Sequence, residues 1–427
     1  MERVGIALLG YGTVGSGVGR LLSESAEEIR LATGKDVYLR RVLELKPDRQ
    51  ALVPDGVQVT TQFADVVGDP DVQIVVELIG GIEPARDFQL ASLKAGKAVV
   101  TANKQLLSQH GAELLQPAED NGTFLRFEAS AVGAVPVIKV LRESLAAAEV
   151  TNIMGIVNGT TNYILSAMAQ SGAEYAPTLK KAQELGFAEA DPTEDVSGKD
   201  AAAKMAILSS IAFHSRVTLA DVEHEGIGGI TDIDVAHGKA LGLVPKLLGV
   251  AQLIDGRINA RVYPCFIPAG HPLAGVSGAY NAVFLESETF DKIMLFGPGA
   301  GGTPTASAVI GDVISVVNTA RGGYVRNCVC YKDLGFYPND EVVSRFYLRV
   351  QVVDESGVLA TIAGIFGDQG VSIHSMQQIG EEETAQLVLV FHPVKEAAFF
   401  RALERISALP VVRGTPSVIR MEAYDAR

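Results

Sequence analysis

The chain has 427 residues, of which 48% are hydrophobic and 44 are glycine, which predicts a globular protein of two or three domains and excludes a coiled coil or a disordered chain. Because 36 basic and 50 acidic residues leave a net charge of -14, we expect no nucleic-acid partner. The sequence shows neither a signal region nor an apolar stretch of membrane-spanning length, which predicts no membrane partner and a cytoplasmic location. The three cysteines lack metal-ligand spacing and are interpreted as structural thiols of a reducing compartment: Cys265, Cys328 and Cys330.

A glycine-rich turn follows the first predicted strand, residues 3–9, and precedes a helical pattern over residues 14–32. The turn consists of Gly10, Tyr11, Gly12, Thr13, Val14 and Gly15. Between a strand and a helix, this GxGxxG spacing predicts a dinucleotide site: Gly10 permits the tight turn, Gly12 admits a pyrophosphate, and Gly15 lets the helix pack on the strand. The alternative is a glycine-rich turn that binds nothing.

The second predicted strand covers residues 37–43 and ends beside Glu44. An acid at this place bonds the ribose hydroxyls of NAD and repels the 2′-phosphate of NADP. Four basic residues nearby in the sequence are able to neutralise such a phosphate: Arg40, Arg41, Lys46 and Arg49. The choice between NAD and NADP is therefore open.

Further strands over residues 73–81 and 98–104 alternate with a helix over residues 84–94. This alternation predicts an α/β fold with a Rossmann-type, doubly wound parallel sheet, whose ligands lie at the carboxyl ends of its strands. Thr101 and Lys104 occupy such an end. A lysine at a helix start opposes the helix dipole, which favours a site role for Lys104 over that of a surface lysine.

Residues 123–137 begin as another strand and break at Gly133 and Pro136, which predicts a crossover into a second domain. Glu128 and nearby carbonyls suit a cation, although a buried, hydrogen-bonded carboxylate is the commoner explanation. Farther along, residues 158–162 separate a strand from a helix, and their hydroxyls and amides either cap the helix or bond a polar substrate.

An acidic segment, residues 182–204, ends in Lys204. Its glycines and proline predict an irregular connection that carries Glu189, Asp191, Glu194 and Asp195. A helix follows from residue 197 and places Asp200 and Lys204 one turn apart on one side. The alternative is an acidic helix start with an ordinary surface ion pair, but a carboxylate and an ammonium facing loop acids indicate an active site.

Beyond this segment we predict a helix over residues 232–248 and strands over residues 253–264, 282–287 and 292–296. Four of the six residues 297–302 are glycine, and this turn precedes a helix over residues 303–321. A turn of this kind, with Gly301 and Gly302, closes over a bound cofactor or substrate, or else serves as a flexible lid or linker.

The C-terminal part has a different pattern, in which strands and helices over residues 345–421 follow the order β-α-β-β-α-β. This order is that of the ferredoxin-like split unit. We expect a separate small domain.

Taken together, these motifs resemble the homoserine dehydrogenases of the larger, regulated kind. The resemblance runs over nearly the whole chain, through residues 10–18, 76–81, 99–104, 127–137, 158–165, 186–204 and 297–312. Residues 355–376 also resemble an ACT domain, with Ser356 and Gly357 where the usual turn is Pro-Gly.

The resemblance implies NAD(P)-dependent, reversible reduction of L-aspartate 4-semialdehyde to L-homoserine, in threonine, isoleucine and methionine biosynthesis. It implies that Lys204 is the acid/base, with Lys104 as the second catalytic lysine. It implies that Glu189, Asp200 and Thr160 bind the substrate. The implied cofactor residues are Gly10 to Gly15, Glu44, Thr101, Lys104, Gly186, Glu189, Gly301 and Gly302.

The resemblance also implies a sodium site, formed by Glu128 with the carbonyls of Ala131, Gly133 and Val135. An amino-acid effector such as L-threonine is expected at the ACT domain, and a homodimer or homotetramer is expected in solution. The expected domains are residues 1–135 for the dinucleotide, with residues 303–321 returning to them, residues 136–325 for substrate, catalysis and dimerisation, and residues 345–421 for regulation.

Two other functions fit the sequence less well. A semialdehyde dehydrogenase needs a nucleophilic thiol, and none of the cysteines follows a strand end beside a base. An amino-acid sensor without catalysis is disfavoured because Lys204, Asp200 and Glu189 are all present.

Overall fold

The computed structural model describes residues 2–319, 330–381 and 383–422, so Cys328 and the end of the predicted helix over residues 303–321 lie outside the described residues. The chain forms two compact units. Unit 1 consists of Met1–Val157, Ala201–Glu223 and Tyr280–Leu334, and unit 2 of Asn158–Asp200, His224–Ala279 and Gly335–Arg427. No helix among the described residues is long and apolar enough to cross a membrane.

Unit 1 contains a six-stranded parallel sheet in the order β3-β2-β1-β4-β5-β6, the order of dinucleotide-binding folds. Its strands are β1 (Arg3–Leu9), β2 (Asp36–Leu43), β3 (Gln58–Thr60), β4 (Val72–Glu77), β5 (Ala98–Thr101) and β6 (Leu125–Arg126). The helices between them are α1 (Thr13–Glu24), α2 (Ala26–Thr33), α3 (Pro47–Gln50), α4 (Phe63–Val67), α5 (Ala85–Lys94) and α6 (Lys104–Asp120). The central strands are continuously apolar because helices cover both faces of such a sheet. The predicted doubly wound fold is confirmed.

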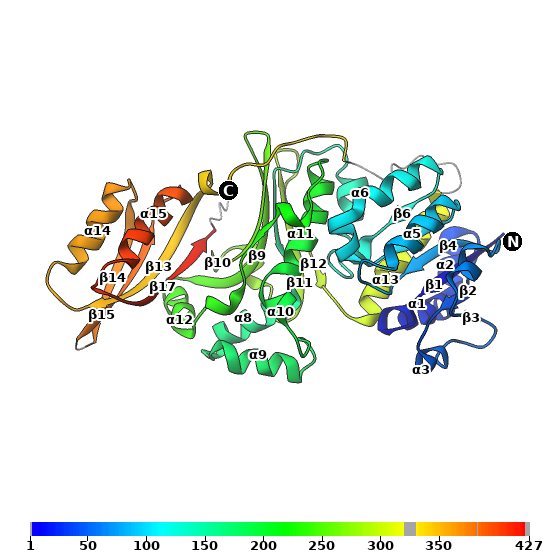
Figure 1. The fold of residues 1–427 in the computed structure, drawn as a ribbon, viewed down its shortest axis with the longest axis horizontal. Coiled ribbons are helices and arrows are strands. Elements are labelled where there is room, and N and C mark those ends of the chain that lie inside the picture. The colour runs from blue at the N-terminus through cyan, green and yellow to red at the C-terminus, as the bar shows by residue number, and fades with distance from the viewer. Residues whose placement is uncertain (1, 320–329, 382, 423–427) are drawn as a thin grey trace. The chain divides into compact units, whose positions relative to one another are not determined.

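Helix α13 (Gly302–Thr319) packs beside α1 (Figure 1). Ala306 and Val309 share a buried cluster with Val18 of α1 and with the apolar side chains of β1. The approach is close, because a Cβ atom on Gly17 would lie 3.1 Å from the Cβ of Ala306. A segment far along the sequence thus completes the core around the parallel sheet.

The prediction of one continuous helix over residues 14–32 is wrong, because the helix is interrupted. The chain forms α1 and α2, separated at Ser25, whose backbone angles of φ -107° and ψ 25° are not helical. Gly34 then ends α2 in the left-handed conformation, at φ 66°.

The remainder of unit 1 leads from the parallel sheet to three antiparallel strands. Its elements are η1 (Glu128–Ser130), α7 (Val137–Lys139), η2 (Val140–Ser144), β7 (Asn152–Ile156), η3 (Leu219–Asp221), β8 (Glu223–His224, whose last residue belongs to unit 2), β11 (Tyr280–Ser287) and β12 (Asp291–Pro298). Strand β11 pairs antiparallel with both β7 and β12. Helix α11 (Lys199–Ala212) begins at the end of one unit-2 segment and continues into unit 1.

Unit 2 begins with helices and continues with a long hairpin. The elements are α8 (Gly159–Ser171), α9 (Tyr175–Glu184), α10 (Thr193–Val196), η4 (Ile227–Gly229), α12 (Asp232–Ala240), β9 (Leu243–Ile254), β10 (Arg257–Pro268) and η5 (Pro272–Gly275). The helix predicted over residues 232–248 is therefore wrong beyond Ala240. Gly242 turns the chain at φ 72°, and the apolar residues after it pair with β10 along the whole hairpin.

The C-terminal domain has the predicted β-α-β-β-α-β order. It contains η6 (Asn339–Glu341), β13 (Val343–Val353), α14 (Val358–Asp368), β14 (Ile373–Glu381), β15 (Thr384–Phe391), β16 (Val394–Lys395), α15 (Glu396–Ser407) and β17 (Val412–Met421). Helices α14 and α15 cover one face of the sheet (Figure 1), and Phe346 stacks on Phe399 in its core with the ring centroids 3.8 Å apart. Strand β17 also pairs with β10, so one sheet joins this domain to the rest of unit 2.

Candidate active site

The glycine-rich turn after β1 has the geometry of a phosphate-binding loop. Gly10 has φ +93°, a conformation that only glycine adopts without strain. Gly15 packs so tightly that a Cβ atom there would lie 2.2 Å from the carbonyl oxygen of Gly10. Gly12 precedes the first turn of α1, whose N-terminal N–H groups are able to receive a pyrophosphate.

Glu44 lies under this turn. Its carboxylate is 6% exposed and accepts hydrogen bonds from the backbone N–H groups of Tyr11 at 2.8 Å, Leu45 at 2.9 Å and Lys46 at 3.0 Å. Burial raises the pKa of Glu44, but these backbone donors outweigh burial, and the pKa lies below its ordinary value. The ionised carboxylate therefore supports the glycine turn from below, a role that spacing in the sequence does not reveal.

The four basic residues near Glu44 differ in their positions. Arg40 and Arg41 both bond to the buried carboxylate of Asp69. Arg49, in contrast, lies beside the glycine turn: its Nη1 atom would be 3.2 Å from a Cβ atom on Gly12, and it is 4.0 Å from Oε2 of Glu44. A guanidinium thus stands next to the turn that would hold the phosphates.

The second glycine-rich turn meets the first. A Cβ atom on Gly302, the first residue of α13, would lie 2.9 Å from Cγ2 of Thr13, the first residue of α1. Gly301 has φ +120°, which turns the chain into α13. The structure therefore brings together two predicted cofactor segments that are almost 300 residues apart in the sequence.

The ends of β4 and β5 are joined by a buried polar network. Glu77, at the end of β4, accepts hydrogen bonds from Thr101 Oγ1 at 2.8 Å and Gln89 Nε2 at 2.7 Å. Asn103 caps α6 through Leu106 N and donates from Nδ2 to the carbonyl oxygen of Gly81. Thr101 is fully buried within this network, while Lys104, the first residue of α6, is only partly buried. The network fixes the ends of β4 and β5 and the start of α6, whose first residue is Lys104.

Lys204 is anchored to the end of β7. Its Nζ atom donates a 2.7 Å hydrogen bond to the carbonyl oxygen of Val157, and the side chain is partly buried. The ammonium is therefore held by a backbone oxygen, while Asp200 lies one turn earlier in the same helix, α11.

Asn158, the residue after Val157, contacts two of the predicted acids. Its Nδ2 atom donates to Asp195 Oδ1 at 2.7 Å and to Asp200 Oδ2 at 2.9 Å. Its Oδ1 atom accepts from Thr161 N at 2.9 Å and caps α8. Both Asn158 and Asp200 are 4% exposed.

The loop that carries Glu189 is held by α8 and α9. Thr160 donates from Oγ1 to the carbonyl oxygen of Phe187 at 2.6 Å, and Gln183 Nε2 donates to the carbonyl oxygen of Glu189 at 3.1 Å. The Glu189 side chain is exposed. Gly186 and Glu189 belong to unit 2, whereas the glycine turns belong to unit 1.

Glu128 is the first residue of η1 in unit 1, and its carboxylate lies against the start of α7. Its two carboxylate oxygens accept hydrogen bonds from Ile138 N at 2.8 Å and Lys139 N at 2.7 Å, and its own N–H donates to Asp312. Burial, with a contribution from Asp312, raises the pKa of Glu128 to about 7. Within the described ranges, no group of three or more His, Cys, Asp or Glu side chains is placed to hold a metal ion.

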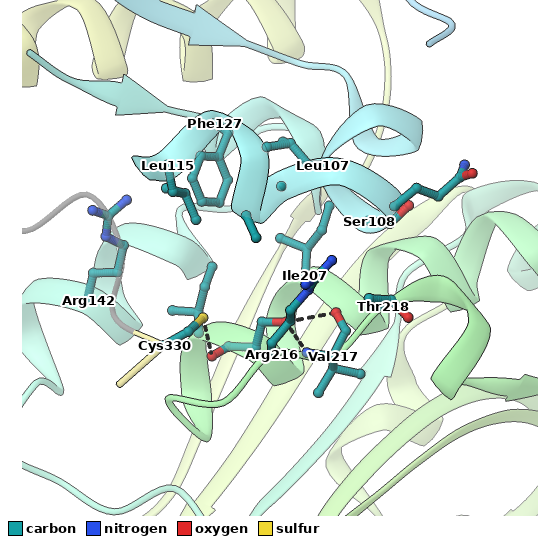
Figure 2. Close-up of a pocket in the computed structure, with 15 residues that line it drawn as sticks. Leu107, Ser108, Leu115, Phe127, Arg142, Ile207, Arg216, Val217, Thr218 and Cys330 are labelled. Carbon is teal, nitrogen blue, oxygen red and sulfur yellow. Dashed lines mark hydrogen bonds between the residues drawn. The ribbon is translucent and has the colours of Figure 1, made fainter. Parts of the chain in front are cut away.

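Unit 1 also encloses an apolar cavity of about 190 Å³ between α6 and α11 (Figure 2). Leu107, Phe127 and Ile207 line it, and Ser210 at its wall bonds to both backbone groups of Val217. Of the described residues around the cavity, none is a predicted substrate or cofactor residue.

Comparison with known proteins identifies the family of the chain. A family model described as homoserine dehydrogenase matches residues 136–314, and one described as the homoserine dehydrogenase NAD-binding domain matches residues 10–128. The homoserine dehydrogenase of Corynebacterium glutamicum is 44% identical to the chain, over 98% of this chain and 96% of its own length. The chain belongs to the homoserine dehydrogenase family. The homoserine dehydrogenase of Bacillus subtilis is 40% identical to the chain, over 99% of both chains.

Solved structures of the homoserine dehydrogenase family have the same fold. The crystal structure of a homoserine dehydrogenase from Thiobacillus denitrificans covers 99% of both chains with a TM-score of 0.94 and 39% identity. A hyperthermophilic archaeal homoserine dehydrogenase in complex with NADPH covers 76% of this chain with a TM-score of 0.64 and 25% identity. Residues 346–411 match an ACT domain, as the sequence predicted. The chain is therefore an oxidoreductase of amino-acid biosynthesis with a nicotinamide-binding domain and a regulatory ACT domain.

Proposed function

We propose that the protein catalyses reversible hydride transfer between L-homoserine and L-aspartate 4-semialdehyde, on the route to threonine, isoleucine and methionine. The observation that carries this mechanism is the placement of Lys204 and Asp200 one turn apart on α11, with the Lys204 ammonium held at Val157 O and the Asp200 carboxylate held by Asn158. A proton carrier and an anchor for a substrate cation are thereby fixed on one rigid helix.

In oxidation, the neutral amine form of Lys204 would accept the proton of the homoserine hydroxyl and become an ammonium, and in reduction the ammonium would return that proton to the carbonyl oxygen. Lys104, at the start of α6, would supply a second positive charge near the reacting oxygen. The nicotinamide supplies the hydride acceptor or donor when it is bound. The protein's part is to orient the substrate and to move one proton.

The substrate is a small zwitterion, so its ammonium needs carboxylates. We assign this role to Glu189, on the loop held by α8 and α9, and to Asp200. Thr160 would contribute through its hydroxyl oxygen, which already donates to Phe187 O and keeps its lone pairs for a substrate donor.

For the cofactor, we propose that NADP is the preferred form. The support is that Glu44 is held among three backbone donors under the turn, while Arg49 stands beside Gly12. The archaeal relative was solved with NADPH. The other cofactor residues are those predicted from the sequence, namely residues 10–15, Thr101, Lys104, Gly186, Glu189, Gly301 and Gly302.

The preference is tested by the Michaelis constants for NADP and NAD in Arg49→Ala. The variant should raise the constant for NADP about tenfold and leave that for NAD nearly unchanged, because only NADP carries the 2′-phosphate. Arg40→Ala is the matched control, since Arg40 pairs with Asp69. Equal changes for both cofactors would contradict the assignment to Arg49.

A sodium ion at residues 128–135 is proposed with the carbonyl oxygens as its main ligands. The Glu128 carboxylate is already bonded to two N–H groups of α7, so it would shape the loop while the carbonyls of Ala131, Gly133 and Val135 face the ion. Gly133 fits such a loop: its φ is +59°, and a Cβ atom there would lie 2.4 Å from the carbonyl of Gly299. A melting temperature that rises with sodium chloride but not with choline chloride would support the site, and equal effects would refute it.

The ACT domain would bind an amino acid such as L-threonine and thereby regulate the enzyme. A cavity of about 410 Å³ lies where β13 turns into α14, lined by Asp354, Gly357 and Gln378 among others. Backbone N–H groups and carboxylates at such a turn suit a zwitterion. Threonine added to the homoserine assay should slow the reaction, and an unchanged rate at millimolar threonine would contradict this assignment.

We further propose that the protein is a cytoplasmic homodimer or homotetramer. In this proposal, residues 136–325 form the substrate and dimerisation domain. Residues 1–135 and 303–321 form the nucleotide domain, and residues 345–421 form the regulatory domain. In support of self-association, the edge strand β12 exposes Met294 at 39% and Phe296 at 54%. The described thiol of Cys265 is free, which agrees with a reducing compartment. Light scattering on the eluting protein measures the mass directly, and a monomer would refute the proposal.

The activity is tested by following NADPH formation with L-homoserine and NADP, and then the reverse reaction with L-aspartate 4-semialdehyde. Homoserine-dependent turnover in both directions is expected. Threonine binding without turnover with either cofactor would instead indicate an amino-acid sensor.

A further inference from the structure

Asn158 uses both ends of its side chain. The oxygen Oδ1 accepts hydrogen bonds from the N–H of Thr161 at 2.9 Å and from its hydroxyl at 3.0 Å, as the cap of α8 requires. Because a carboxamide oxygen accepts and a carboxamide nitrogen donates, the cap fixes which end faces away from the helix. The nitrogen must therefore face the acidic segment.

At that end, one amide group holds two carboxylates. Asn158 Nδ2 donates one hydrogen atom to Asp195 Oδ1 at 2.7 Å and the other to Asp200 Oδ2 at 2.9 Å. Hydrogen bonds to carboxylates are about twice as strong as those between neutral groups. The orientation of the Asp200 carboxylate is thus set by a residue outside its own helix.

No other residue of similar size performs both tasks. Serine and threonine cap helices well but lack the two N–H donors that the acids occupy. Aspartate also caps well, but it would place a third carboxylate against Asp195 and Asp200. The amide therefore both caps α8 and donates to the two acids. Only the cap concerns folding.

The position in the chain links Asn158 to the proton carrier. Val157, the preceding residue, accepts the hydrogen bond of Lys204 Nζ at 2.7 Å. Val157 and Asn158, the two residues after Ile156 of β7, therefore hold two groups of α11 that are one turn apart. Val157 holds the Lys204 ammonium through its backbone carbonyl, and Asn158 holds the Asp200 carboxylate through its side chain. The spacing between the Asp200 carboxylate and the Lys204 ammonium depends on both contacts.

We propose that Asn158 is a positioning residue of the reaction, whose amide orients the Asp200 carboxylate toward the substrate ammonium and keeps it in register with Lys204. The inference rests on the proposed function, in which Asp200 binds homoserine. It assigns to Asn158 a role beyond the cap of α8, and it makes Asp195 the second acid of a shared hydrogen-bonding pair.

The test uses Asn158→Ser and Asn158→Asp, which both keep an oxygen for the cap and remove the amide donor. We expect the Michaelis constant for homoserine to rise at least tenfold in both, with a larger loss in Asn158→Asp, while the constant for NADP changes less than twofold. The matched control is Asn152→Ser, at the start of the strand that precedes Asn158, which removes an amide contact to Glu286 that does not involve α11. It should leave both constants near wild type.

A rescue experiment separates positioning from general damage. Asp195→Asn combined with Asn158→Asp restores an amide and a carboxylate with exchanged places, so part of the lost kcat/KM for homoserine should return. Should Asn158→Ser unfold, the comparison of Asn158→Asp with the double variant still decides. A wild-type constant for homoserine in either single variant, or no recovery in the double variant, would overturn the inference alone. An inactive wild-type enzyme would instead overturn the proposed function, and the inference with it.

Discussion

The ammonium of Lys204 is bonded to the carbonyl oxygen of Val157 at 2.7 Å. Because a backbone carbonyl cannot move independently of its strand, the position of Nζ is set by the end of β7 and not by a flexible partner. Such fixed placement limits the number of orientations that must be lost before proton transfer. The same helix, α11, also carries Asp200 one turn earlier.

Replacing Glu189 by glutamine should weaken homoserine binding without weakening the fold. The side chain is exposed, so its removal leaves no buried group unsatisfied. We expect the Michaelis constant for homoserine to increase about tenfold or more, because an ammonium loses a charged partner. Steady-state kinetics and a melting curve measure both quantities, and an unchanged constant would exclude Glu189 from the substrate site.

Gly15→Ala should impair cofactor binding and stability together. The added methyl group would lie 2.2 Å from the carbonyl oxygen of Gly10, so the glycine turn or α1 must shift. We expect a loss of about 1–3 kcal/mol in the free energy of unfolding and a cofactor dissociation constant raised more than tenfold. Gly111→Ala in α6 is the control: nothing lies within 4 Å of its Cβ position, so the change should stabilise the helix by about 0.5–1 kcal/mol. Fluorescence titration with NADPH and urea unfolding report the two effects.

The pH dependence of stability should reveal the buried Lys246. Its Nζ atom donates to Asn162 Oδ1 at 3.0 Å and to the carbonyl oxygen of Val276, and burial lowers its pKa to about 8. Below pH 8 both the folded and the unfolded chain carry the proton. Between about pH 8 and the ordinary lysine value of 10.5 only the folded chain releases it, so the free energy of unfolding should rise with pH in this window.

Comparison with Lys246→Met isolates this effect from other titrations. Between pH 7 and pH 9 the wild-type protein should gain about 1 kcal/mol relative to the variant. Urea unfolding at the two pH values measures the difference. A wild-type protein whose stability relative to the variant stays constant over this range would show that the lysine keeps its proton in the fold.

A buried ion pair between the ACT domain and α12 should contribute strongly to stability. Asp234 of α12 is fully buried and bonds to Arg349 of β13 through both carboxylate oxygens, at 2.6 and 3.0 Å. Arg349→Met would leave this carboxylate without its cation, at an expected cost of about 3–5 kcal/mol. Arg405→Met is the control, because its pair with Asp368 is largely exposed. Equal melting temperatures for the two variants would contradict the assigned role.

Much of the fold follows from local sequence patterns. The strand, glycine turn and helix at residues 3–24 each satisfy a local rule, and the order of elements in the ACT domain needs only alternation and turn residues. The helix predicted over residues 232–248 failed because the residues after Gly242 are apolar enough for either state. Their pairing with β10, a contact made by distant residues, decides for a strand.

The site shows a similar limit. Spacing in α11 predicts that Asp200 and Lys204 share a face, but the partners that hold them, Asn158 and Val157, are more than 40 residues earlier. Glu44 illustrates the same point: an acid after the second strand is predictable, while its bond to Tyr11 N depends on how β1 and β2 pair. Residue types and local order are thus predictable, whereas hydrogen-bond partners brought together by the fold are not.

In the proposed reaction, Lys204 carries the proton. The most direct measurement is kcat for homoserine oxidation with saturating NADP in wild-type protein and in Lys204→Ala, with melting temperature and NADP binding as controls for folding. Loss of a general acid/base predicts a decrease in kcat of about 10²–10⁴-fold, with nearly unchanged NADP binding. A folded Lys204→Ala protein that keeps a kcat within a fewfold of wild type would contradict the account.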